Sequence, residues 1–420
     1  MDNVEFLLLL NEQFEAFICM LLLNASLLYL LRARIYCILD PLFFQIVTAV
    51  CANTVPMFLY WNGYVTGEKL LFVILAEFFF WFGFYIRSKK KIVGFSEESV
   101  FFSNSEIEKK VFLLFFYFLI LSNIFIFVSS GIPLLMDSRF EIFQGNKLVV
   151  LFNRLSIIPE VYCYIYIYNQ IQHKKYSALL PFLILLFIKI LYGGKGFILN
   201  CVYAYFFYSL FYLRQVPKLK LKYLLLIILS PIIVIVIYYG IGNFQEAFLF
   251  LLYRFIASGD GYWQGFSYDL IDGIDGSTYA LERVFSFILG PLGLIHEEAK
   301  IPLGTLILSQ LNPAVIDTIE GANARPPIFA WYCFKWIGVI FTFICGYMMA
   351  FFTNSSLIKI PRGLIGTSVM AAIYMASMCF ATDPNLALSQ LFSVAFFIML
   401  FNMVLKILSG YNIAFFKLKS

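Results

Sequence analysis

The chain has 420 residues, of which 62% are hydrophobic, 20% aromatic and only 13% charged. Soluble domains average about 45–50% apolar and roughly 25% charged residues. The composition therefore disfavours a water-soluble enzyme, a nucleic-acid-binding protein and a disordered chain, and it indicates a protein whose solvent is mostly lipid. The formal net charge of +5 is less informative in such a protein than the positions of its basic residues.

Long apolar runs recur along the chain and predict an all-α, polytopic membrane protein. A membrane-spanning helix needs about 20 mainly apolar residues at a rise of about 1.5 Å per residue. By this criterion we expect eleven spans in a single membrane domain, residues 1–420. The predicted spans are 14–31, 36–60, 70–86, 111–129, 148–168, 177–193, 197–213, 223–239, 328–352, 363–381 and 386–405.

Lys and Arg are distributed unevenly between alternate connections. The connections on one side carry 19 basic residues, those on the other side carry 8, and three lie within predicted spans. Because cytoplasmic loops are enriched in Lys and Arg, the richer side is predicted to be cytoplasmic. This places the C-terminus in the cytoplasm and the N-terminus outside, in agreement with an odd number of spans.

Two connections on the predicted outer side are long. The larger covers residues 240–327 and holds ten of the 25 acidic residues, so we expect a folded extramembrane element there. Loops of this length are usually functional. The smaller covers 130–147 and mixes apolar and polar residues in a way that is typical of a short helix at the membrane interface.

Arg154 stands early in a predicted span. A guanidinium there costs about 2.5–3.5 kcal/mol on insertion scales unless it faces a partner or a wet cavity. The alternative to an anion site is a structural arginine that snorkels outward or pairs with a carboxylate. Glu160, six positions later, lies on a different side of a continuous helix and is not an obvious partner. Asp40 and Glu77 have no cation in their own helices and are interpreted as packing polar groups.

The sequence Gly193-Gly194-Lys195-Gly196 joins two predicted spans through almost no loop. Glycine permits the positive φ values and the close approach of helix ends that such a reversal requires. A tight hairpin alone accounts for this pattern. The alternative is an anion site, because Lys195 would lie beside the start of the next helix, whose N–H groups and dipole attract negative charge.

The stretch 252–275 places aromatic residues beside carboxylates and amides. A sugar needs this combination because its ring face stacks on an aromatic ring while its hydroxyls bond to polar groups. The alternative is an aromatic belt at the membrane interface. The spacing of Asp269, Asp272 and Asp275 does not fit an EF-hand calcium loop. The candidate sugar-binding residues are Tyr262, Trp263 and Tyr268, and the same stretch contains Arg254 and Asp260.

Further cations lie on the predicted outer side. Arg283 is one, and Arg325 stands where the chain re-enters the membrane. Each alone is typical of a solvated or headgroup contact. His296 is the single histidine on that side and is interpreted as structural. The cations available to one outer cavity are Arg139, Lys147, Arg154, Lys195, Arg254, Arg283 and Arg325.

The order of these features resembles the Wzy-type polymerases of O-antigen repeat units. The shared pattern is a GIPLL run before Arg139, Arg154 followed by Pro159 in the next span, a glycine-rich hairpin with Lys195, and a late outer loop opening with Arg254. Some relatives carry Arg where this chain has Lys195, which keeps the charge but loses bidentate geometry. The resemblance implies a GT-C-like glycosyltransferase of the bacterial inner membrane. Such an enzyme joins undecaprenyl-diphosphate-linked oligosaccharide units at the periplasmic face for lipopolysaccharide.

The residues fit the chemistry that this resemblance implies. A sugar on a lipid diphosphate already has a leaving group, so the protein needs cations for the departing charge and a carboxylate to take the acceptor proton. No metal or cofactor is required. Membrane lipid and a chain-length regulator protein are the expected partners beside the lipid-linked substrate. The expected roles are diphosphate binding by Arg154, Lys195 and Arg254, assistance from Arg139, Arg283 and Arg325, and proton abstraction by Asp260.

Two other functions remain open at this point. An O-antigen ligase would use the same donor with a lipid A core acceptor, and its family typically depends on a histidine in the outer loop, which His296 would supply. A lipid-linked oligosaccharide flippase or another transporter usually shows paired repeats and broken helices. The sequence contains no visible repeat.

Overall fold

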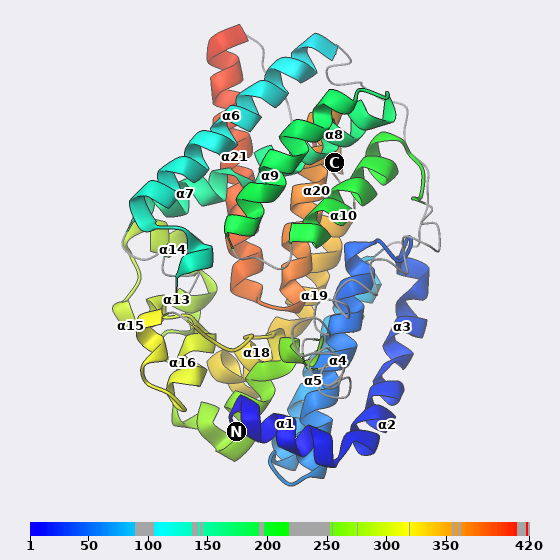
Figure 1. Cartoon of the computed structure of the whole chain (residues 1–420). Helices are drawn as coiled ribbons and strands as arrows, with labels where there is room; N and C mark the ends of the chain where they lie inside the picture. Colours follow the sequence, from blue (N-terminus) through cyan, green and yellow to red (C-terminus); the bar gives the residue numbers. More distant parts are fainter. Residues whose placement is uncertain are drawn as a thin grey trace, which may run out of the picture.

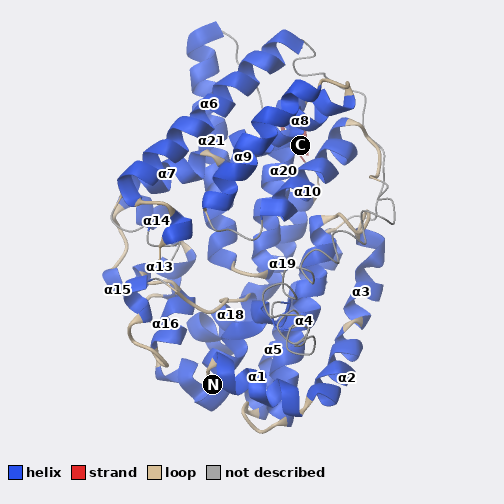
Figure 2. Cartoon of the chain, in the orientation of Figure 1, coloured by secondary structure: helices blue, strands red, loops and turns tan. Residues whose placement is uncertain are grey.

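The computed structural model describes most of the chain, with gaps. Within the described ranges the chain is almost entirely helical (Figures 1 and 2). The one sheet in these ranges pairs β1 (Ile358–Lys359) with β2 (Lys417–Leu418) in antiparallel orientation. The prediction of a helical, polytopic membrane protein is confirmed. The described residues are 1–88, 105–136, 142, 146–192, 197–217, 253, 255–274, 276–318, 320–354, 358–359, 363–409 and 417–418.

The elements follow one another with short connections. In the first half the helices are α1 (Asn3–Glu12), α2 (Phe14–Asn24), α3 (Ser26–Leu31), α4 (Pro41–Trp61), α5 (Gly67–Arg87), α6 (Ser105–Ser130), α7 (Lys147–Leu155), α8 (Ile157–Gln172), α9 (Leu179–Leu191) and α10 (Phe197–Phe207). In the second half they are α13 (Ala280–Val284), α14 (Ser286–Leu292), α15 (Glu297–Lys300), α16 (Leu303–Ser309), α17 (Val315–Thr318), α18 (Pro326–Phe334), α19 (Gly338–Thr353), α20 (Leu364–Met378) and α21 (Pro384–Ser409). Short 3₁₀ or π turns are η1 (Arg32–Arg34), η2 (Pro133–Leu135), η4 (Tyr176–Ala178), η5 (Tyr208–Tyr212), η7 (Ala257–Gly259), η8 (Tyr262–Phe266), η9 (Ser267–Gly273), η10 (Lys335–Ile337) and η12 (Cys379–Ala381).

Eight helices of the described residues are long and apolar enough to cross a membrane. Three of the eleven predicted spans are not among them. The segment Tyr176–Leu191 is a shorter apolar helix, and the predicted span 197–213 is divided between α10 and η5. The predicted span 223–239 lies outside the described residues. The eight helices are Phe14–Arg34, Pro41–Trp61, Gly67–Arg87, Glu106–Leu135, Lys147–Gln172, Pro326–Thr353, Leu364–Ala381 and Pro384–Met403.

Asp40 shows how local sequence starts a span. Its side chain accepts a hydrogen bond from the backbone N–H of Leu42 and so caps α4, and Pro41 occupies the first helical position, where a missing N–H costs nothing. The Tyr374 hydroxyl donates to the same carboxylate at 2.8 Å. Asp40 is therefore a packing polar group, as the sequence predicts, and it fastens α20 to the start of α4.

Two hydrophobic cores hold the helices together. The larger is built by α6, α8, α10, α20 and α21 with one end of α4 and α5. The second is built by α1, η8 and α18 with the other end of α4 and α5. In Figure 1 the first group occupies the upper half of the molecule, and α1 and α18 lie in the lower half. The long helices α4 and α5 thus join two separately packed regions.

The helices α5 and α19 pack with their backbones in contact. A Cβ atom on Gly346 would lie 1.8 Å from the Phe80 carbonyl oxygen, and one on Gly83 would lie 2.4 Å from the Phe343 carbonyl oxygen. Side chains other than hydrogen cannot fit at such distances, so glycine is required at both positions. Small residues that let backbones approach closely are the usual solution in lipid, where dispersion contacts drive helix association.

The short helix α18 runs along α5 toward the end of α5 that begins at Gly67. At the start of α18, Arg325 Nη2 lies 3.8 Å from Glu77 Oε1. Just beyond its end, Trp336 Nε1 donates to Glu68 Oε1 at 3.0 Å. Successive residues of α18 therefore meet successively earlier residues of α5.

The next helix, α19, runs along α5 in the opposite direction. Thr342 Oγ1 donates to the Ala76 carbonyl at 2.9 Å, and Asn354 Nδ2 donates to the Arg87 carbonyl at 3.4 Å. Between the two helices, η10 opens with a residue at positive φ, which breaks the helical path. The predicted single span 328–352 is therefore folded as a re-entrant helical hairpin of α18 and α19.

Parts of the long connection 240–327 also lie against mid-helix positions. Near its described start, Ser258 Oγ donates to the Thr48 carbonyl of α4 at 3.2 Å. At its end, Arg325 lies beside Glu77, near the middle of α5. Irregular backbone at such depth is stable only where protein or water satisfies its polar groups. The connection predicted as an extramembrane element therefore inserts its two described ends between helices.

Candidate functional site

A polar cavity of about 350 Å³ lies within the helical bundle. Its walls come from α6, α7, α8, α9 and α21, which lie near one another in the upper half of Figure 1. Polar residues inside a lipid-embedded bundle are costly, so a cavity that gathers them is a candidate functional site. Its polar lining residues are Asn123, Asn153, Arg154, Ser156, Glu160, Tyr164, Lys189, Tyr192, Ser389, Gln390 and Ser393.

The cavity lies at one end of the surrounding spans. Residue Asn123 comes from the second half of α6 and Lys189 from the last turn of α9. Glu160 comes from the first turn of α8 and Gln390 from the early part of α21. Since α6 and α9 run in the opposite direction to α8 and α21, all four positions belong to the same end. The distribution of Lys and Arg predicts that this end faces outside.

Arg154 lines the cavity from the last turn of α7. The helix ends at Leu155 and α8 begins at Ile157, which fits the position of Pro159, since proline has no N–H for the carbonyl four residues earlier. This break lets Arg154 and Glu160 line the same cavity, although a continuous helix would put them on different sides. Arg154 is half-buried, and no described residue forms a hydrogen bond or ion pair with it.

Lys189 and Glu160 form an ion pair inside the cavity. Lys189 Nζ lies 2.6 Å from Glu160 Oε2, with side-chain exposures of 29% and 15%. The ammonium also lies 5.7 Å from the centre of the Tyr192 ring. Sequence reasoning counted Lys189 among the cations within spans but did not select it, and it rejected Glu160 only as a partner of Arg154. The signal was available, because every ionisable residue in a span is a functional candidate.

A second polar cluster surrounds Arg325, at the N-terminus of α18. Arg325 is only 1% exposed, and besides Glu77 its guanidinium lies near the Tyr262 hydroxyl. Its Nε and Nη1 atoms form no hydrogen bond among the described residues. Such buried, unbonded N–H groups indicate space that ordered water or another small polar group would satisfy. The sequence analysis placed Arg325 in an outer cavity, whereas the structure buries it.

Asp260 adjoins this second cluster rather than the cavity of Arg154. Its Oδ1 accepts hydrogen bonds from the backbone N and the Nδ2 of Asn323, at 2.6 and 3.0 Å. Burial raises the pKa of the Asp260 carboxyl to about 6, although the Asn323 hydrogen bonds and the charge of Arg325 oppose this rise. A carboxylate that titrates near neutral pH is suited to proton transfer. Its use as the catalytic base stays a prediction.

Arg283 is held by backbone carbonyls. Its Nη1 donates to the Ile301 carbonyl and its Nη2 to the Glu298 carbonyl, both at 2.7 Å, and the side chain is buried. The guanidinium thereby joins α13 to the chain on either side of α15. This position differs from the solvated or headgroup contact that the sequence suggests, because the carbonyls replace water around the charge.

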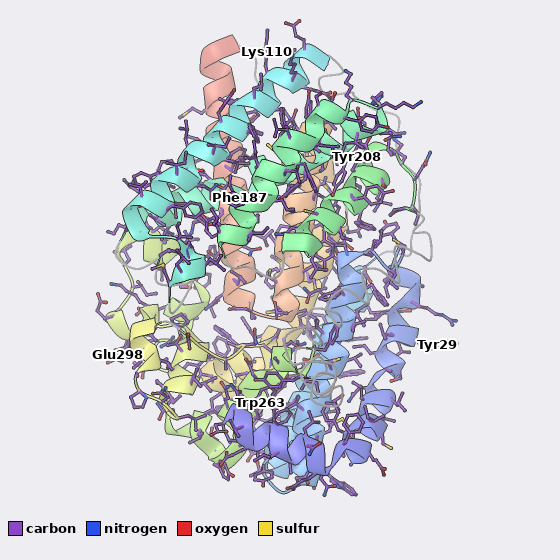
Figure 3. All side chains as sticks on the ribbon, in the orientation of Figure 1. Tyr29, Lys110, Phe187, Tyr208, Trp263 and Glu298 are labelled. Carbon is purple, nitrogen blue, oxygen red and sulfur yellow. The ribbon has the colours of Figure 1, made fainter. Side chains whose placement is uncertain are left out.

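The predicted sugar-binding aromatics are separated by their burial. Trp263 is fully buried, stacks on Phe6 with ring centroids 4.1 Å apart, and lies low in the molecule (Figure 3). Tyr262 is also fully buried, so neither ring presents a face to a sugar. Tyr268 is 59% exposed and adopts a φ of 56°. Among the three rings, sugar stacking is compatible only with Tyr268. In the same view Phe187, on cavity helix α9, lies in the upper half.

Asp269 and Asp272, which do not fit a calcium loop, pair with lysines instead. Lys69 is almost fully buried, and its Nζ lies 2.5 Å from Asp269 Oδ1 and 2.7 Å from Asp272 Oδ2. Lys335 Nζ lies 2.6 Å from the other oxygen of Asp272. These pairs fasten the loop after η8 to α5 and to the turn between α18 and α19. Sequence analysis missed Lys69 because its partners are distant in the chain.

Three predicted site residues, Arg139, Lys195 and Arg254, lie outside the described residues. Of the predicted cations with a described position, Arg154 lines the cavity, while Arg283 and Arg325 are absent from its lining. The cavity instead pairs Arg154 with a cation that was not selected, Lys189.

His296 lies on the exposed side of the long connection. Its Nδ1 is 2.7 Å from Glu282 Oε1, and its backbone N–H donates to Glu282 Oε2 at 2.9 Å. These hydrogen bonds from His296, the backbone one first, lower the pKa of the Glu282 carboxyl. The imidazole is 67% exposed and is therefore accessible.

Comparison with protein-family models, curated proteins and solved structures finds no match to this chain. Function is therefore argued from the residues and their geometry.

Proposed function

We propose that this protein is a membrane glycosyltransferase that polymerises oligosaccharide units carried on undecaprenyl diphosphate, as an O-antigen polymerase does. The observation that carries this proposal is the polar cavity in which Arg154 and Lys189 lie together at one end of the bundle. The resemblance in the order of sequence motifs supports the same function.

The charges of the cavity suit a diphosphate. Arg154 and Lys189 contribute two positive charges and Glu160 contributes one negative charge, so the described lining carries an excess of positive charge. Cations fixed in a low-dielectric site stabilise the charge that develops on a departing diphosphate without reorganising at the moment of reaction. The volume of about 350 Å³ lies within the range of small-molecule sites and accommodates a head group while the lipid tail stays in the bilayer.

The proposed orientation brings the cavity to the side where lipid-linked units are polymerised. With the Lys- and Arg-rich connections in the cytoplasm, the end of the bundle that holds the cavity faces the periplasm. The protein then resides in the bacterial inner membrane with its N-terminus periplasmic and its C-terminus cytoplasmic. Its partners are the lipid-linked oligosaccharide, membrane lipid and a chain-length regulator.

The decisive test is deletion of the gene followed by gel analysis of lipopolysaccharide. Loss of the ladder with single-unit caps retained supports a polymerase. Complementation with Arg154→Ala is expected to leave only single units, whereas Arg214→Ala, a cation outside the cavity lining, is expected to restore the ladder. A normal ladder with Arg154→Ala at wild-type protein level would contradict the proposal.

An O-antigen ligase is a second candidate because of the contact between His296 and Glu282. A carboxylate that orients an exposed imidazole is the arrangement that a histidine base requires. A ligase would lose even the single-unit cap on gene deletion and on His296→Ala. A polymerase would keep both the cap and its activity in this variant.

A transporter of lipid-linked oligosaccharide is a third candidate because of the re-entrant hairpin of α18 and α19. Broken helices with ionisable residues at mid-membrane depth, such as Arg325 and Glu77 here, are common at transporter binding sites. Deletion of a flippase would trap lipid-linked units on the cytoplasmic face. Deletion of a polymerase would leave them accessible to periplasmic enzymes.

A further inference from the structure

The cavity contains one carboxylate among its described lining residues. That residue is Glu160, and it shares the cavity with Arg154 and Lys189. Asp260, the carboxylate that the sequence favours as the base, is absent from this lining and is occupied by Asn323. A general base must reach the proton that it abstracts, either directly or through one water. Glu160 meets this geometric condition for a substrate in the cavity, whereas Asp260 does not.

The two oxygens of the Glu160 carboxylate have different surroundings. Oε2 is held by the Lys189 ammonium at 2.6 Å. No described residue hydrogen-bonds to Oε1, which leaves one oxygen available to a ligand in the cavity. Lys189 is in turn placed near the Tyr192 ring, so the carboxylate is fixed in orientation by a group on a neighbouring helix.

The presence of this pair is not explained by stability. Replacing a buried ion pair by apolar side chains is often neutral or stabilising, because the attraction between the charges barely offsets their desolvation. Inside a membrane, ionisable side chains are rare for the same reason and usually mark function. A pair that also lines a cavity beside a cation without a partner therefore indicates chemistry rather than packing.

We propose that Glu160 is the catalytic base of the glycosyl transfer and that Lys189 is its positioning residue. This inference rests on the proposed function. The acceptor hydroxyl oxygen forms a bond to the anomeric carbon of the donor, while the bond from that carbon to the diphosphate oxygen breaks and the diphosphate leaves with the electron pair. Glu160 Oε1 takes the hydroxyl proton, and Arg154 lies where the charge of the leaving diphosphate develops.

The first experiment compares purified variants in vesicles supplied with undecaprenyl-diphosphate-linked repeat units. Glu160→Gln keeps the size of the side chain but cannot accept a proton, so kcat is expected to fall at least about 100-fold. The donor KM is expected to change by less than about threefold, because the amide still fills the cavity. Lys189→Arg is expected to retain kcat within about tenfold, since it preserves the positive contact to Oε2.

The double variant Glu160→Gln/Lys189→Met separates catalysis from structure. Each single change leaves one group of the pair without its partner, whereas the double change removes both charges and is expected to restore unfolding stability. If the pair is only structural, kcat returns together with stability, which would overturn the proposal. If Glu160 is the base, the double variant is stable and remains at least about 100-fold slow.

A matched ion pair outside the cavity provides the control. Glu106 and Lys110 form an exposed pair on α6, and each side chain is 73% exposed. The variant Glu106→Gln/Lys110→Met is expected to retain wild-type kcat and stability.

The two levels of failure are distinct. If the wild-type protein forms no polymer in vesicles and its gene deletion leaves the lipopolysaccharide ladder intact, the proposed function fails, and the role of Glu160 fails with it. If the wild-type protein polymerises and the double variant does so equally well, only the role of Glu160 and Lys189 is overturned.

Discussion

Arg325 Nη2 lies 3.8 Å from Glu77 Oε1, and both side chains are buried within the protein. The pair joins the start of the re-entrant helix α18 to the middle of α5. Two guanidinium nitrogens of Arg325 remain without hydrogen bonds in the described part of the chain. The fold thus holds a charged pair at mid-helix depth in a region distinct from the cavity of Arg154.

Removing one member of this pair is expected to destabilise the protein strongly. Arg325→Met leaves Glu77 as a buried carboxylate without its cation, which typically costs about 3–5 kcal/mol. The double variant Glu77→Gln/Arg325→Met is expected to recover a large part of that loss, because no isolated charge remains. Denaturant unfolding in detergent micelles measures both. Equal stability of Arg325→Met and the wild type would contradict the importance of the pair.

Lys69 is expected to hold the loop after η8 against α5. Lys69→Met removes a buried ammonium from Asp269 and Asp272, so we expect a loss of about 1–3 kcal/mol and faster proteolysis within 267–274. Lys300→Met provides the control, because Lys300 pairs with Glu297 at the surface and its loss is expected to cost less than about 1 kcal/mol. Limited proteolysis with mass spectrometry locates the cleavage. Identical cleavage patterns in the two variants would exclude this role of Lys69.

Asp260 predicts a pH dependence of stability. Burial raises its pKa from 3.8 to about 6, so the folded state binds the proton more tightly than the unfolded state. The contribution to stability is therefore complete below about pH 4 and decreases as pH rises through 6, by about 3 kcal/mol in total. Asp260→Asn is expected to remove this component. Unfolding of both proteins from pH 4 to 8 measures the difference, with Glu106→Gln as the surface control. Parallel curves for Asp260→Asn and the wild type would disprove the assignment.

The contact between α5 and α19 predicts that Gly346 tolerates no side chain. A Cβ there would lie 1.8 Å from the Phe80 carbonyl oxygen, so Gly346→Ala must separate the helices and is expected to cost about 2 kcal/mol or more. Gly290→Ala, in α14, is the matched control, because a Cβ at that position meets no atom within 4 Å. Since alanine is the better helix former, this control is expected to be neutral or stabilising by up to about 1 kcal/mol. Thermal unfolding of both variants in one detergent provides the comparison, and equal melting temperatures would refute the prediction.

Metal removal is expected to leave the proposed reaction unchanged. In the proposed chemistry the positive charge opposite the diphosphate comes from Arg154 and Lys189 of the chain itself. Polymer formation in vesicles is therefore expected to persist after treatment with EDTA. A loss of polymer that added Mg²⁺ or Mn²⁺ reverses would show that a divalent cation takes part.

The sequence by itself determines the class of the protein and most of its spans. Hydropathy and the frequency of Lys and Arg are properties of local stretches, and the bilayer acts on each stretch separately, so eight of the eleven predicted spans are found as helices. The cost of burying charge also marks Arg154 as a candidate without any knowledge of the fold. These inferences need no contacts between distant residues.

The tertiary structure alone decides which charged residues share a site. Glu160 meets Lys189, and Glu77 meets Arg325, through the packing of separate helices, which no local pattern encodes. The same holds for the reversal between α18 and α19, because its apolar residues read as one continuous span. Packing depends on the shapes of helix faces brought together from distant positions, and therefore the grouping of residues into a cavity and a second buried cluster emerges only in three dimensions.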